Sequence, residues 1–433
     1  MSQNDENVID FKLDNHMSQN SINYFFTTFY GRDELANKIM KETLEKKYNQ
    51  KFEPIYVLQT IIKELPKNYI IINRELKGTK LKNYILMRDP EDLVADFSIS
   101  PFIKNLIKKL SKKQERIFCY FFTTSFFSLK HPKIKVIGPN PKLTTYLDSK
   151  KVQFNIFEEL NLPHPNFNIF NNLNQVIKYK NSNKIIVYSN YNSGGYHSQI
   201  INEKIDFEKF AEKIIENKKE GPFISVEFLD DVLLSPNVNA IITETKIKVL
   251  NITDQILDGN KYLGNIFPSI ASENVNNKIV EITNKIGIYL QKLGFRGIFG
   301  CDFIVDDKEN VFIVDLNPRR QGGYSILCAL DNNLVRKELE IHIENQDLEI
   351  SNINYNPNFS WAQLKIFPEN YLKKFEQSSI KYINENFLNN DEGFISFYPK
   401  KSIIKSPDPI GHYILRTNNL NETKNKLKNL NLN

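Results

Sequence analysis

The chain has 433 residues, and at roughly 100–200 residues per domain this length predicts two to four domains. Hydrophobic residues make up 41% and charged residues 25%, which excludes a chain that is disordered throughout. Lys and Arg total 57 and Asp and Glu total 51, so the formal charge is +6, spread without a dense basic block. A charge this small and dispersed does not favour nucleic acid as a partner.

Cysteine content and apolar runs set further limits. The three cysteines, Cys119, Cys301 and Cys328, are too few and too scattered for a disulfide framework or a Cys-based zinc site. No apolar run reaches the roughly 18 residues of a membrane helix, and the N-terminal segment lacks the apolar core of a signal peptide. We therefore expect a cytoplasmic protein with no membrane partner, and a homodimer is one assembly compatible with the sequence.

The first third of the chain alternates between strand-like and helix-like segments, after a polar stretch over residues 1–20 that predicts a flexible tail. The predicted strands are 22–30, 69–72, 84–87 and 117–122, and the predicted helices are 32–48, 55–65 and 102–110. This alternation predicts a parallel, Rossmann-like sheet over residues 21–145. No G-x-G-x-x-G follows these strands, so this region lacks the sequence sign of a nucleotide site.

A different pattern begins near Lys133, with a strand that enters a Gly-Pro turn and a helix from Leu143 that is stopped by Pro163 and Pro165. The further predicted strands are 185–188, 199–201, 223–229, 238–243, 246–253, 300–305 and 311–315, and the further predicted helices are 207–217 and 275–293. The last section contains short strand-like pieces such as 393–404, and it closes on a polar helix or tail over residues 418–433.

The sharpest group of polar residues lies in GIFGCDFIVDDKENVFIVDLNPRRQGG, residues 297–323. Two predicted neighbouring strands each present one carboxylate, from Asp302 and from Asp315, and Asn317 shares the face of Asp315 because strand side chains alternate with period two. Carboxylate and amide oxygens are the ligands that Mg²⁺ prefers. Arg319 follows at the next position on that face, where its planar guanidinium can hold a phosphate.

The competing interpretation is an acidic hairpin whose carboxylates are only solvated. It fits Asp306, Asp307 and Glu309, which lie in the predicted turn. It fits Asp315 poorly, because the run VFIVD places this residue at the end of a strand that is apolar on both faces. The metal interpretation is therefore preferred for this carboxylate.

These residues resemble the ATP-grasp superfamily, whose last two core strands read D-F and then (E/D)-x-N-P-R. Here the matching stretches are Asp302–Phe303 and Asp315–Arg319. Earlier stretches follow in the family's order: 147–165 looks like its opening helix, 223–231 like its adenine hinge, and 233–259 is similar to the peptide-ligase branch that carries a pre-ATP-grasp domain.

This resemblance implies an α/β protein of four parts. After the tail over residues 1–20, it implies a Rossmann-like pre-ATP-grasp domain over 21–145. A two-lobed ATP-grasp domain, each lobe α+β, follows over 146–345, and a short C-terminal segment follows over 346–433.

The resemblance also implies the site residues. Asp302, Asp315 and Asn317 would ligate one or two Mg²⁺ ions, and Arg319 would stabilise an acyl-phosphate and the transition state. The residues expected to contact ATP are Lys150 or Lys151 near the phosphates, Tyr188 on the strand before the phosphate loop, Ser193, Gly194 and Gly195 in that loop, and Val226, Glu227 and Leu229 at the adenine hinge. A tight turn between two strands is the alternative interpretation of the Gly194–Gly195 pair.

One position departs from the family pattern. The strand before the Gly-rich loop usually carries a lysine, and here it reads IIVYSNYNSGG, which puts Tyr188 at that place. A phenol can hydrogen-bond a phosphate but supplies no positive charge. Either another cation such as Lys184 substitutes, or phosphate binding is weakened, or the protein is a degenerate member.

The expected function is ATP-dependent ligation of a carboxylate to an amine through an acyl-phosphate, with ATP and Mg²⁺ as cofactors. The expected partners are small-molecule or peptide carboxylates and amines. The alternatives are a non-catalytic or regulatory ATP-binding protein, motivated by Tyr188, and an enzyme that forms an acyl-phosphate for a non-amine acceptor.

Overall fold

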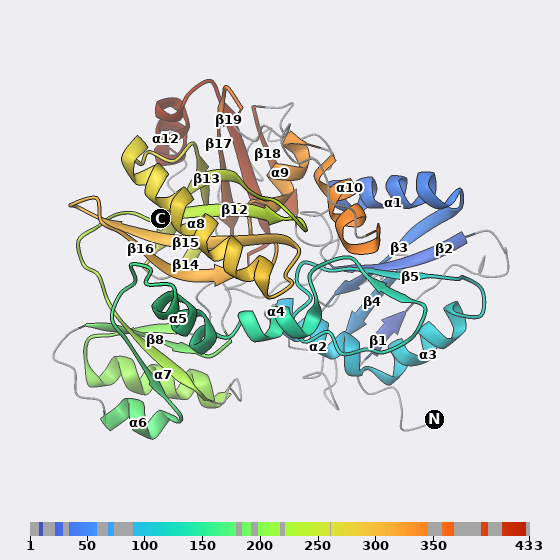
Figure 1. Cartoon of the computed structure of the whole chain (residues 1–433), viewed down its shortest axis with the longest axis horizontal. Helices are drawn as coiled ribbons and strands as arrows, with labels where there is room; N and C mark the ends of the chain where they lie inside the picture. Colours follow the sequence, from blue (N-terminus) through green and yellow to red (C-terminus); the bar gives the residue numbers. More distant parts are fainter. Residues whose placement is uncertain are drawn as a thin grey trace.

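The fold is described from a computed structural model of the chain. The structure describes residues 8–11, 22–28, 34–58, 68–72, 90–178, 184–191, 198–216, 221–259, 261–331, 333–344, 357–367, 391–396 and 409–429. Three sheets organise these residues, a six-stranded, a four-stranded and a nine-stranded one. Figure 1 shows the six-stranded sheet on the right and the other two on the left.

The six-stranded sheet is built from the first third of the chain. Its order is β1-β4-β3-β2-β5-β6, and all neighbours are parallel except β1 and β4. The strands are β1 (Val8–Phe11), β2 (Ile22–Thr28), β3 (Lys51–Leu58), β4 (Tyr69–Ile72), β5 (Ile117–Tyr120) and β6 (Ile134–Val136), and the helices are α1 (Glu34–Tyr48), α2 (Pro90–Ile99) and α3 (Pro101–Leu110). A parallel sheet of this kind is buried on both faces, as the fully buried β4 and β5 illustrate. The parallel Rossmann-like arrangement predicted from the sequence is confirmed.

Two predictions in this region are wrong. Residues 55–58 belong to the strand β3 and not to a helix, because apolar residues at helical spacing also suit a β-branched strand covered on both faces. Residues 8–11, predicted to lie in a flexible tail, form β1 and pair with β4. The strand predicted at 84–87 lies outside the described residues.

The helix predicted from Leu143 is two helices, α4 (Pro141–Leu147) and α5 (Lys150–Glu159). The break falls at Asp148 and Ser149, where the Ser149 hydroxyl accepts a hydrogen bond from the N–H of Val152 at 3.4 Å and so caps the start of α5. The short polar stretch between two apolar runs was the available sequence signal for this break.

The four-stranded sheet is antiparallel, with the order β7-β10-β8-β9. Its strands are β7 (Phe167–Phe170), β8 (Ile185–Ser189), β9 (Ser198–Ile201) and β10 (Phe223–Glu227), and its helices are α6 (Leu173–Lys178) and α7 (Lys204–Glu216). Both helices pack on this sheet around Val187 and Phe210.

The nine-stranded sheet has the order β11-β15-β12-β13-β14-β17-β19-β18, and β16 pairs with β15. Its strands are β11 (Val232–Leu234), β12 (Pro236–Ile242), β13 (Ile247–Asp258), β14 (Lys261–Phe267), β15 (Gly297–Asp306), β16 (Val311–Asn317), β17 (Ser360–Ile366), β18 (Glu392–Ser396) and β19 (Gly411–Thr417). The accompanying helices are α8 (Glu273–Lys292), α9 (Tyr324–Leu330), α10 (Asn333–Leu339), a π-helical turn (Glu340–Glu344) and α12 (Leu420–Asn429). The C-terminal part therefore extends this sheet by three strands.

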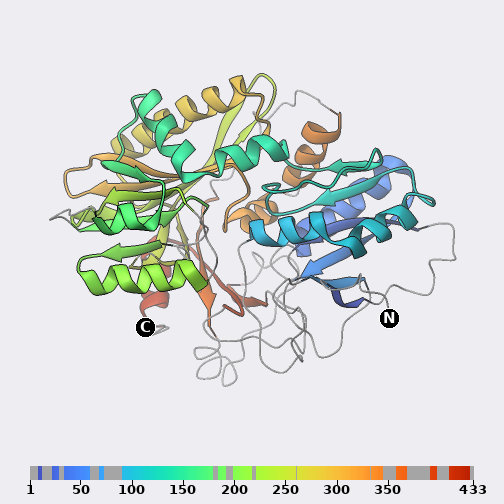
Figure 2. The same ribbon diagram turned by 90° about the horizontal axis from the view of Figure 1, so that it is seen from below.

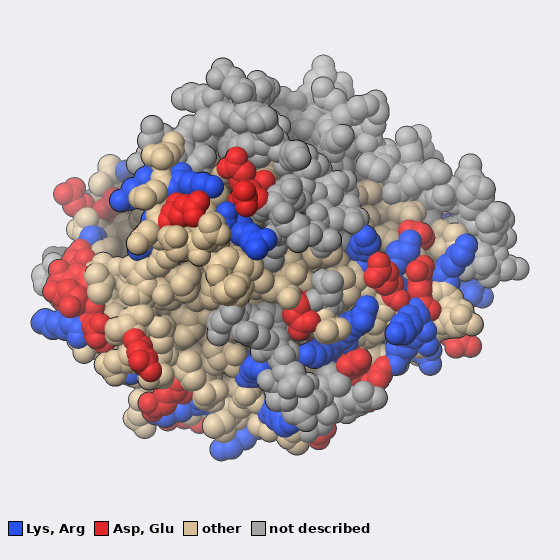
Figure 3. All heavy atoms as spheres, turned by 90° about the horizontal axis from the view of Figure 1, so that it is seen from above, with Lys and Arg blue, Asp and Glu red and all other residues tan. Residues whose placement is uncertain are grey.

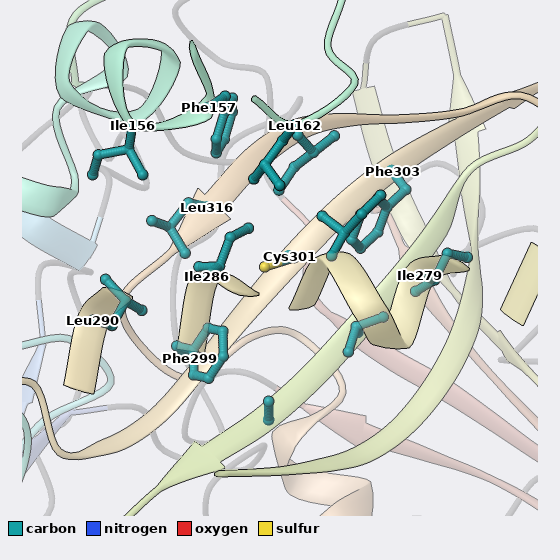
Figure 4. Close-up of a cluster of buried hydrophobic side chains, with 14 of the residues drawn as sticks. Ile156, Phe157, Leu162, Ile279, Ile286, Leu290, Phe299, Cys301, Phe303 and Leu316 are labelled. Carbon is teal, nitrogen blue, oxygen red and sulfur yellow. The ribbon is translucent and has the colours of Figure 1, made fainter. Parts of the chain in front are cut away.

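The core between α8 and the nine-stranded sheet fixes which side chains face the opposite side. Figure 4 shows Phe299, Cys301 and Phe303 of β15 packed with Ile279 and Ile286 of α8. Because side chains alternate along a strand, the residues between these three point away from α8. Asp302 is one of them, so the apolar period of β15 places this carboxylate on the face that α8 leaves open.

Helices α9 and α10 lie against α1, and they share one hydrophobic core with the six-stranded sheet and the ends of β12 and β15. This core links the segment that follows β16 to the N-terminal sheet. Figure 2 shows the four-stranded and nine-stranded sheets together on one side and the six-stranded sheet on the other.

Figure 3 shows basic and acidic side chains interspersed over the described part of one face. No helix among the described residues combines the length and apolar character that crossing a membrane requires. The boundaries of the four predicted segments stay predictions.

Candidate functional site

Two carboxylates and one amide meet on the open face of the nine-stranded sheet. Asp302 of β15 lies directly opposite Asp315 of β16 in the antiparallel register, and Asn317 lies opposite Gly300. The Asn317 Nδ2 donates a hydrogen bond to Asp302 Oδ2 at 3.2 Å. The structure therefore brings together the three side chains that the sequence predicts as metal ligands.

Asp302 is surrounded by amide donors. Besides Asn317, the side chains of Asn237 from β12 and Gln321 from the loop after β16 donate to its Oδ1, the latter at 3.2 Å. Burial and the nearby charge of Asp315 raise the pKa of Asp302 to about 6, although the amide of Asn237 opposes this. A carboxyl with a raised pKa beside a second carboxylate is an electrostatic arrangement that a cation would relieve.

Lys150 supplies a buried positive charge to this group. Its Nζ forms an ion pair with Asp315 and lies 3.3 Å from the Gln153 Oε1. The Lys150 side chain is 4% exposed and the Asp315 side chain 25%. Lys151, the alternative that the sequence leaves open, is exposed on α5.

Asn190, just after β8, holds the start of α5 in place. Its backbone oxygen accepts a hydrogen bond from the Lys150 N–H at 2.8 Å, and its Oδ1 accepts from the Ser149 hydroxyl at 2.8 Å and the Lys151 N–H at 3.1 Å. At the other side, Gln153 donates to the Leu316 carbonyl at 2.6 Å. Both contacts fix Lys150 relative to the two carboxylate strands.

Tyr188 lies at the same site. Its ring centroid is 5.7 Å from the Lys150 Nζ, and burial together with the charge of Asp315 raises its pKa, so the phenol stays neutral. Lys184 does not take the place of the missing lysine: it forms an ion pair with Asp230 at 2.8 Å and lies 3.8 Å from the ring of Phe228. The interpretation in which Lys184 substitutes is therefore not supported by this arrangement.

Arg319 is buried next to the N-terminal part of the chain. Its Nε lies 3.0 Å from Glu91 Oε1 of α2 and 4.0 Å from Asp148 Oδ1, and its guanidinium lies 5.5 Å from the ring centroid of Phe122. Burial lowers the pKa of Arg319, but the surrounding carboxylates, Glu91 first, more than offset this. The guanidinium is therefore charged and closely held.

The predicted adenine hinge follows the end of β10. Val226 is a core residue, and the Glu227 N–H already donates to the Asn166 carbonyl at 2.8 Å. The Phe228 N–H donates to the Lys184 carbonyl at 3.1 Å. Backbone contacts with a base would thus fall to Leu229 and to carbonyl groups of the segment. The predicted phosphate loop, with Ser193, Gly194 and Gly195, lies outside the described residues.

Sequence reasoning missed five residues of this site: Glu91, Asp148, Asn190, Asn237 and Gln321. Four of them come from elements other than the acidic hairpin, and no motif joins them to it. Gln321 follows Arg319 by two residues, a same-face spacing that could have identified it.

The charged side chains of this cluster, among the described residues, are four carboxylates and two cations, which leaves a formal excess of two negative charges. The carboxylates are Glu91, Asp148, Asp302 and Asp315, and the cations are Lys150 and Arg319. Hard oxygen ligands with this excess suit a divalent cation, and Lys150 and Arg319 suit the phosphates that such an ion accompanies. The arrangement can therefore hold a metal–nucleotide pair for phosphoryl transfer.

Comparison with known proteins finds matches to part of the chain, which includes the two strands that carry Asp302 and Asp315. Residues 180–317 match the family described as L-aspartate–L-methionine ligase, ATP grasp. The chain is 33% identical over 113 residues to the L-propargylglycine–L-glutamate ligase of Streptantibioticus cattleyicolor, which covers 26% of this chain and 23% of that protein. It is 27% identical over 138 residues to the [butirosin acyl-carrier protein]–L-glutamate ligase of Niallia circulans, which covers 31% of this chain and 33% of that protein. The matches thus span a quarter to a third of these relatives.

Solved structures resemble the chain over nearly its whole length. A purK N5-carboxyaminoimidazole ribonucleotide synthetase in complex with ADP superposes with a TM-score of 0.61 at 12% identity, covering 98% of both chains. The biotin carboxylase of Campylobacter jejuni superposes with a TM-score of 0.64 at 14% identity, covering 95% of this chain and 91% of that chain. At these identities the likeness is one of fold.

Proposed function

We propose that this chain, an ATP-grasp protein by fold and by sequence match, is an ATP-dependent ligase that joins a carboxylate to an amine. The observation that carries the proposal is the convergence of Asp302, Asp315 and Asn317 with Lys150 and Arg319 in one cluster. Carboxylates for a metal and cations for phosphates are the two halves of a phosphoryl-transfer site.

The residues of the cluster fit Mg²⁺. Asp302, Asp315 and Asn317 offer hard oxygen atoms, and the excess of two negative charges equals the charge of one such ion. Asp302 accepts three amide hydrogen bonds of the about four that a carboxylate can accept, so it is oriented and still has capacity for a cation. A bound ion would neutralise the phosphates of a nucleotide and favour attack on the terminal phosphorus.

ATP would occupy the space between the four-stranded and nine-stranded sheets. Lys150, now paired with Asp315, would turn toward the phosphates, and the neutral Tyr188 would donate a hydrogen bond to them. Ser193, Gly194 and Gly195 would cover the phosphates, and Val226, Glu227 and Leu229 would lie along the adenine. The remaining charge for the transferred phosphoryl group would come from Arg319.

The reaction has two steps. A substrate carboxylate oxygen attacks the γ-phosphorus of ATP, ADP leaves, and an acyl-phosphate forms. The amine nitrogen then attacks the acyl carbon, the C–O bond to phosphate breaks with its electron pair on phosphate, and the nitrogen loses a proton. The names of the matched relatives pair two amino acids, or a carrier protein and glutamate, so we propose that an α-amino acid is one of the substrates here.

The test is formation of ADP from ATP in pools of amino acids, with and without Mg²⁺. Asp315→Asn removes the negative charge of one proposed metal ligand and should lower turnover by at least about 100-fold. Asp307→Asn is the matched control, because Asp307 is exposed in the turn between the same two strands. Turnover that survives Asp315→Asn as well as it survives Asp307→Asn would contradict the assignment.

A second candidate function, non-catalytic ATP binding, is favoured by Tyr188, which supplies no positive charge where the family has a lysine. It predicts that ATP raises the melting temperature while no ADP forms with any acid and amine. The third alternative, an acyl-phosphate made for a non-amine acceptor, predicts hydroxamate formation with hydroxylamine but no amide with any amine supplied.

The proposal also includes the cellular compartment and the oligomeric state. The three cysteines are buried free thiols, which suits the reducing conditions of the cytoplasm. A homodimer stays a prediction, and light scattering on the purified chain measures it directly.

A further inference from the structure

Asp148 is a buried carboxylate that the proposed metal and phosphate contacts do not use. It lies between α4 and α5, is 8% exposed, and its Oδ2 has no hydrogen-bond partner among the residues that the structure describes. Burial raises the pKa of its carboxyl, and the charge of Arg319 opposes this only in part. An unpaired buried carboxylate oxygen is costly, so its retention calls for a ligand that completes it.

Arg319 does not supply that completion. Its Nε is 3.0 Å from Glu91 and 4.0 Å from Asp148, so Glu91 is the closer counter-charge. The pair of carboxylates around a single guanidinium leaves one negative charge in excess on this side of the cluster. The missing partner is therefore a cation or a hydrogen-bond donor.

The groups around Asp148 define what this partner can be. Arg319, Lys150 and Asp315 act on it electrostatically, and its own charge raises the pKa of Tyr191. The nearby Ser125 hydroxyl lowers the pKa of Asp148 through a side-chain hydrogen-bond interaction. Asp315 pairs with Lys150, whereas the Oδ2 of Asp148 has no hydrogen-bond partner among the described residues.

The position of Asp148 relative to the proposed chemistry is set by Arg319. The charges of Asp302 and Asp315 act on this guanidinium, whose Nε lies 3.0 Å from Glu91 and 4.0 Å from Asp148. An acyl-phosphate held by Arg319 would therefore have Asp148 beside it.

We propose that Asp148 binds the ammonium group of the acceptor substrate and takes its proton as the nitrogen attacks the acyl-phosphate. This proposal rests on the proposed ligase function. The ammonium first loses one proton to Asp148 Oδ2, which frees the nitrogen lone pair. This lone pair forms the C–N bond while the C–O bond to phosphate breaks with its electron pair on phosphate, and the departing phosphate takes the second proton from the nitrogen. The acceptor is thus a primary amine that arrives protonated, as the α-ammonium of an amino acid does.

The experiment compares two nucleophiles for the same acyl-phosphate. An amino acid arrives as an ammonium and needs a base, whereas hydroxylamine is mostly unprotonated at neutral pH and needs none. In Asp148→Asn, amide formation with the amino acid should fall on the order of 100-fold, while hydroxamate formation should stay within about twofold of the wild type. Raising the pH should recover amide formation, because more of the amine is then free.

Glu91→Gln is the matched control, because Glu91 also contacts Arg319 and its loss loosens the same guanidinium. It should lower amide and hydroxamate formation by the same factor. If Asp148→Asn behaves like this control, or leaves amide formation unchanged, the proposal is overturned and Asp148 only positions Arg319. If the wild type forms no hydroxamate and no amide, the ligase function itself is wrong, which is a distinguishable result.

Folding of the variant is checked separately. A melting temperature of Asp148→Asn equal to or above that of the wild type is expected, because the variant replaces a buried, incompletely paired charge by a neutral amide. Asp148→Glu should restore part of the amide formation, since it keeps the base. Failure of this rescue together with equal losses for both nucleophiles would again overturn the proposal.

Discussion

Replacing Lys150 by Met should lower the stability of the metal-free protein and increase the stabilisation that Mg²⁺ provides. Met fills a similar volume, so packing around this 4% exposed side chain is kept while its charge is removed. Asp315 then faces Asp302 with no cation beside it. In the wild type, Lys150 and a metal ion compete for Asp315; in the variant, that competition is gone.

The magnitude follows from the exposure of the pair. Removing one partner of a fully buried ion pair costs about 3–5 kcal/mol. Because the Asp315 side chain is 25% exposed, water screens part of its charge, and we expect a loss of roughly 1–3 kcal/mol in the free energy of unfolding. For domains of about 150–250 residues, each kcal/mol lost from the free energy of unfolding lowers the melting temperature by about 2–4 °C.

The assay is thermal unfolding with and without Mg²⁺, in the absence of nucleotide. Lys150→Met should melt lower than the wild type without the ion and should gain more from it. Lys151→Met is the matched control, because Lys151 is exposed one residue further along α5 and should change neither quantity. Equal melting temperatures for Lys150→Met and wild type, or equal gains from Mg²⁺, would refute the reasoning.

Three further predictions concern neighbouring features. Gly300→Ala should weaken Mg²⁺ binding, because the added Cβ would lie 2.0 Å from the end of the Gln321 side chain and displace the amide that holds Asp302. Unchanged metal titration by calorimetry would contradict this. Burial and the nearby Arg320 lower the pKa of His342 to about 3, so below about pH 6.5 the unfolded chain binds a proton that the folded chain refuses. The free energy of unfolding should therefore fall by up to about 1.4 kcal/mol for each pH unit of acidification. The fall should be smaller than this limit because His342 is only half-buried, so water screens part of its charge. His342→Asn should flatten this slope in urea titrations. Tyr188→Lys should raise ATP affinity in equilibrium binding if phosphate contact has been lost at this position, and an unchanged or lower affinity would show that Lys150 already supplies the charge that is needed.

The metal-ligand candidates could be predicted because their placement depends on local rules. The period of two along β15 and β16 puts Asp302 and Asp315 on one face, and a single tight turn makes the two strands neighbours. The α/β fold class followed from the alternation of strand and helix patterns together with the ordered ATP-grasp motifs, and the whole-length structural likeness confirms it. These inferences needed no knowledge of long-range contacts.

The rest depended on contacts between distant segments. Glu91 reaches Arg319 across more than two hundred positions of sequence, and Asn190 reaches the start of α5 from the end of β8, so no spacing rule could have joined them. The same holds for the strand β3, whose apolar positions suit a helix until pairing with β2 and β4 places it inside the parallel sheet. The break at Ser149 was a weak signal, because one capping serine inside a long apolar pattern is common.

The most direct test of the proposed ligase site is a crystal structure of the chain with a non-hydrolysable ATP analogue and Mg²⁺. We predict a metal ion bound by Asp302, Asp315 and Asn317, with Lys150 released from Asp315 toward the phosphates. A nucleotide bound elsewhere, or a metal ion bound without these three side chains, would contradict the account.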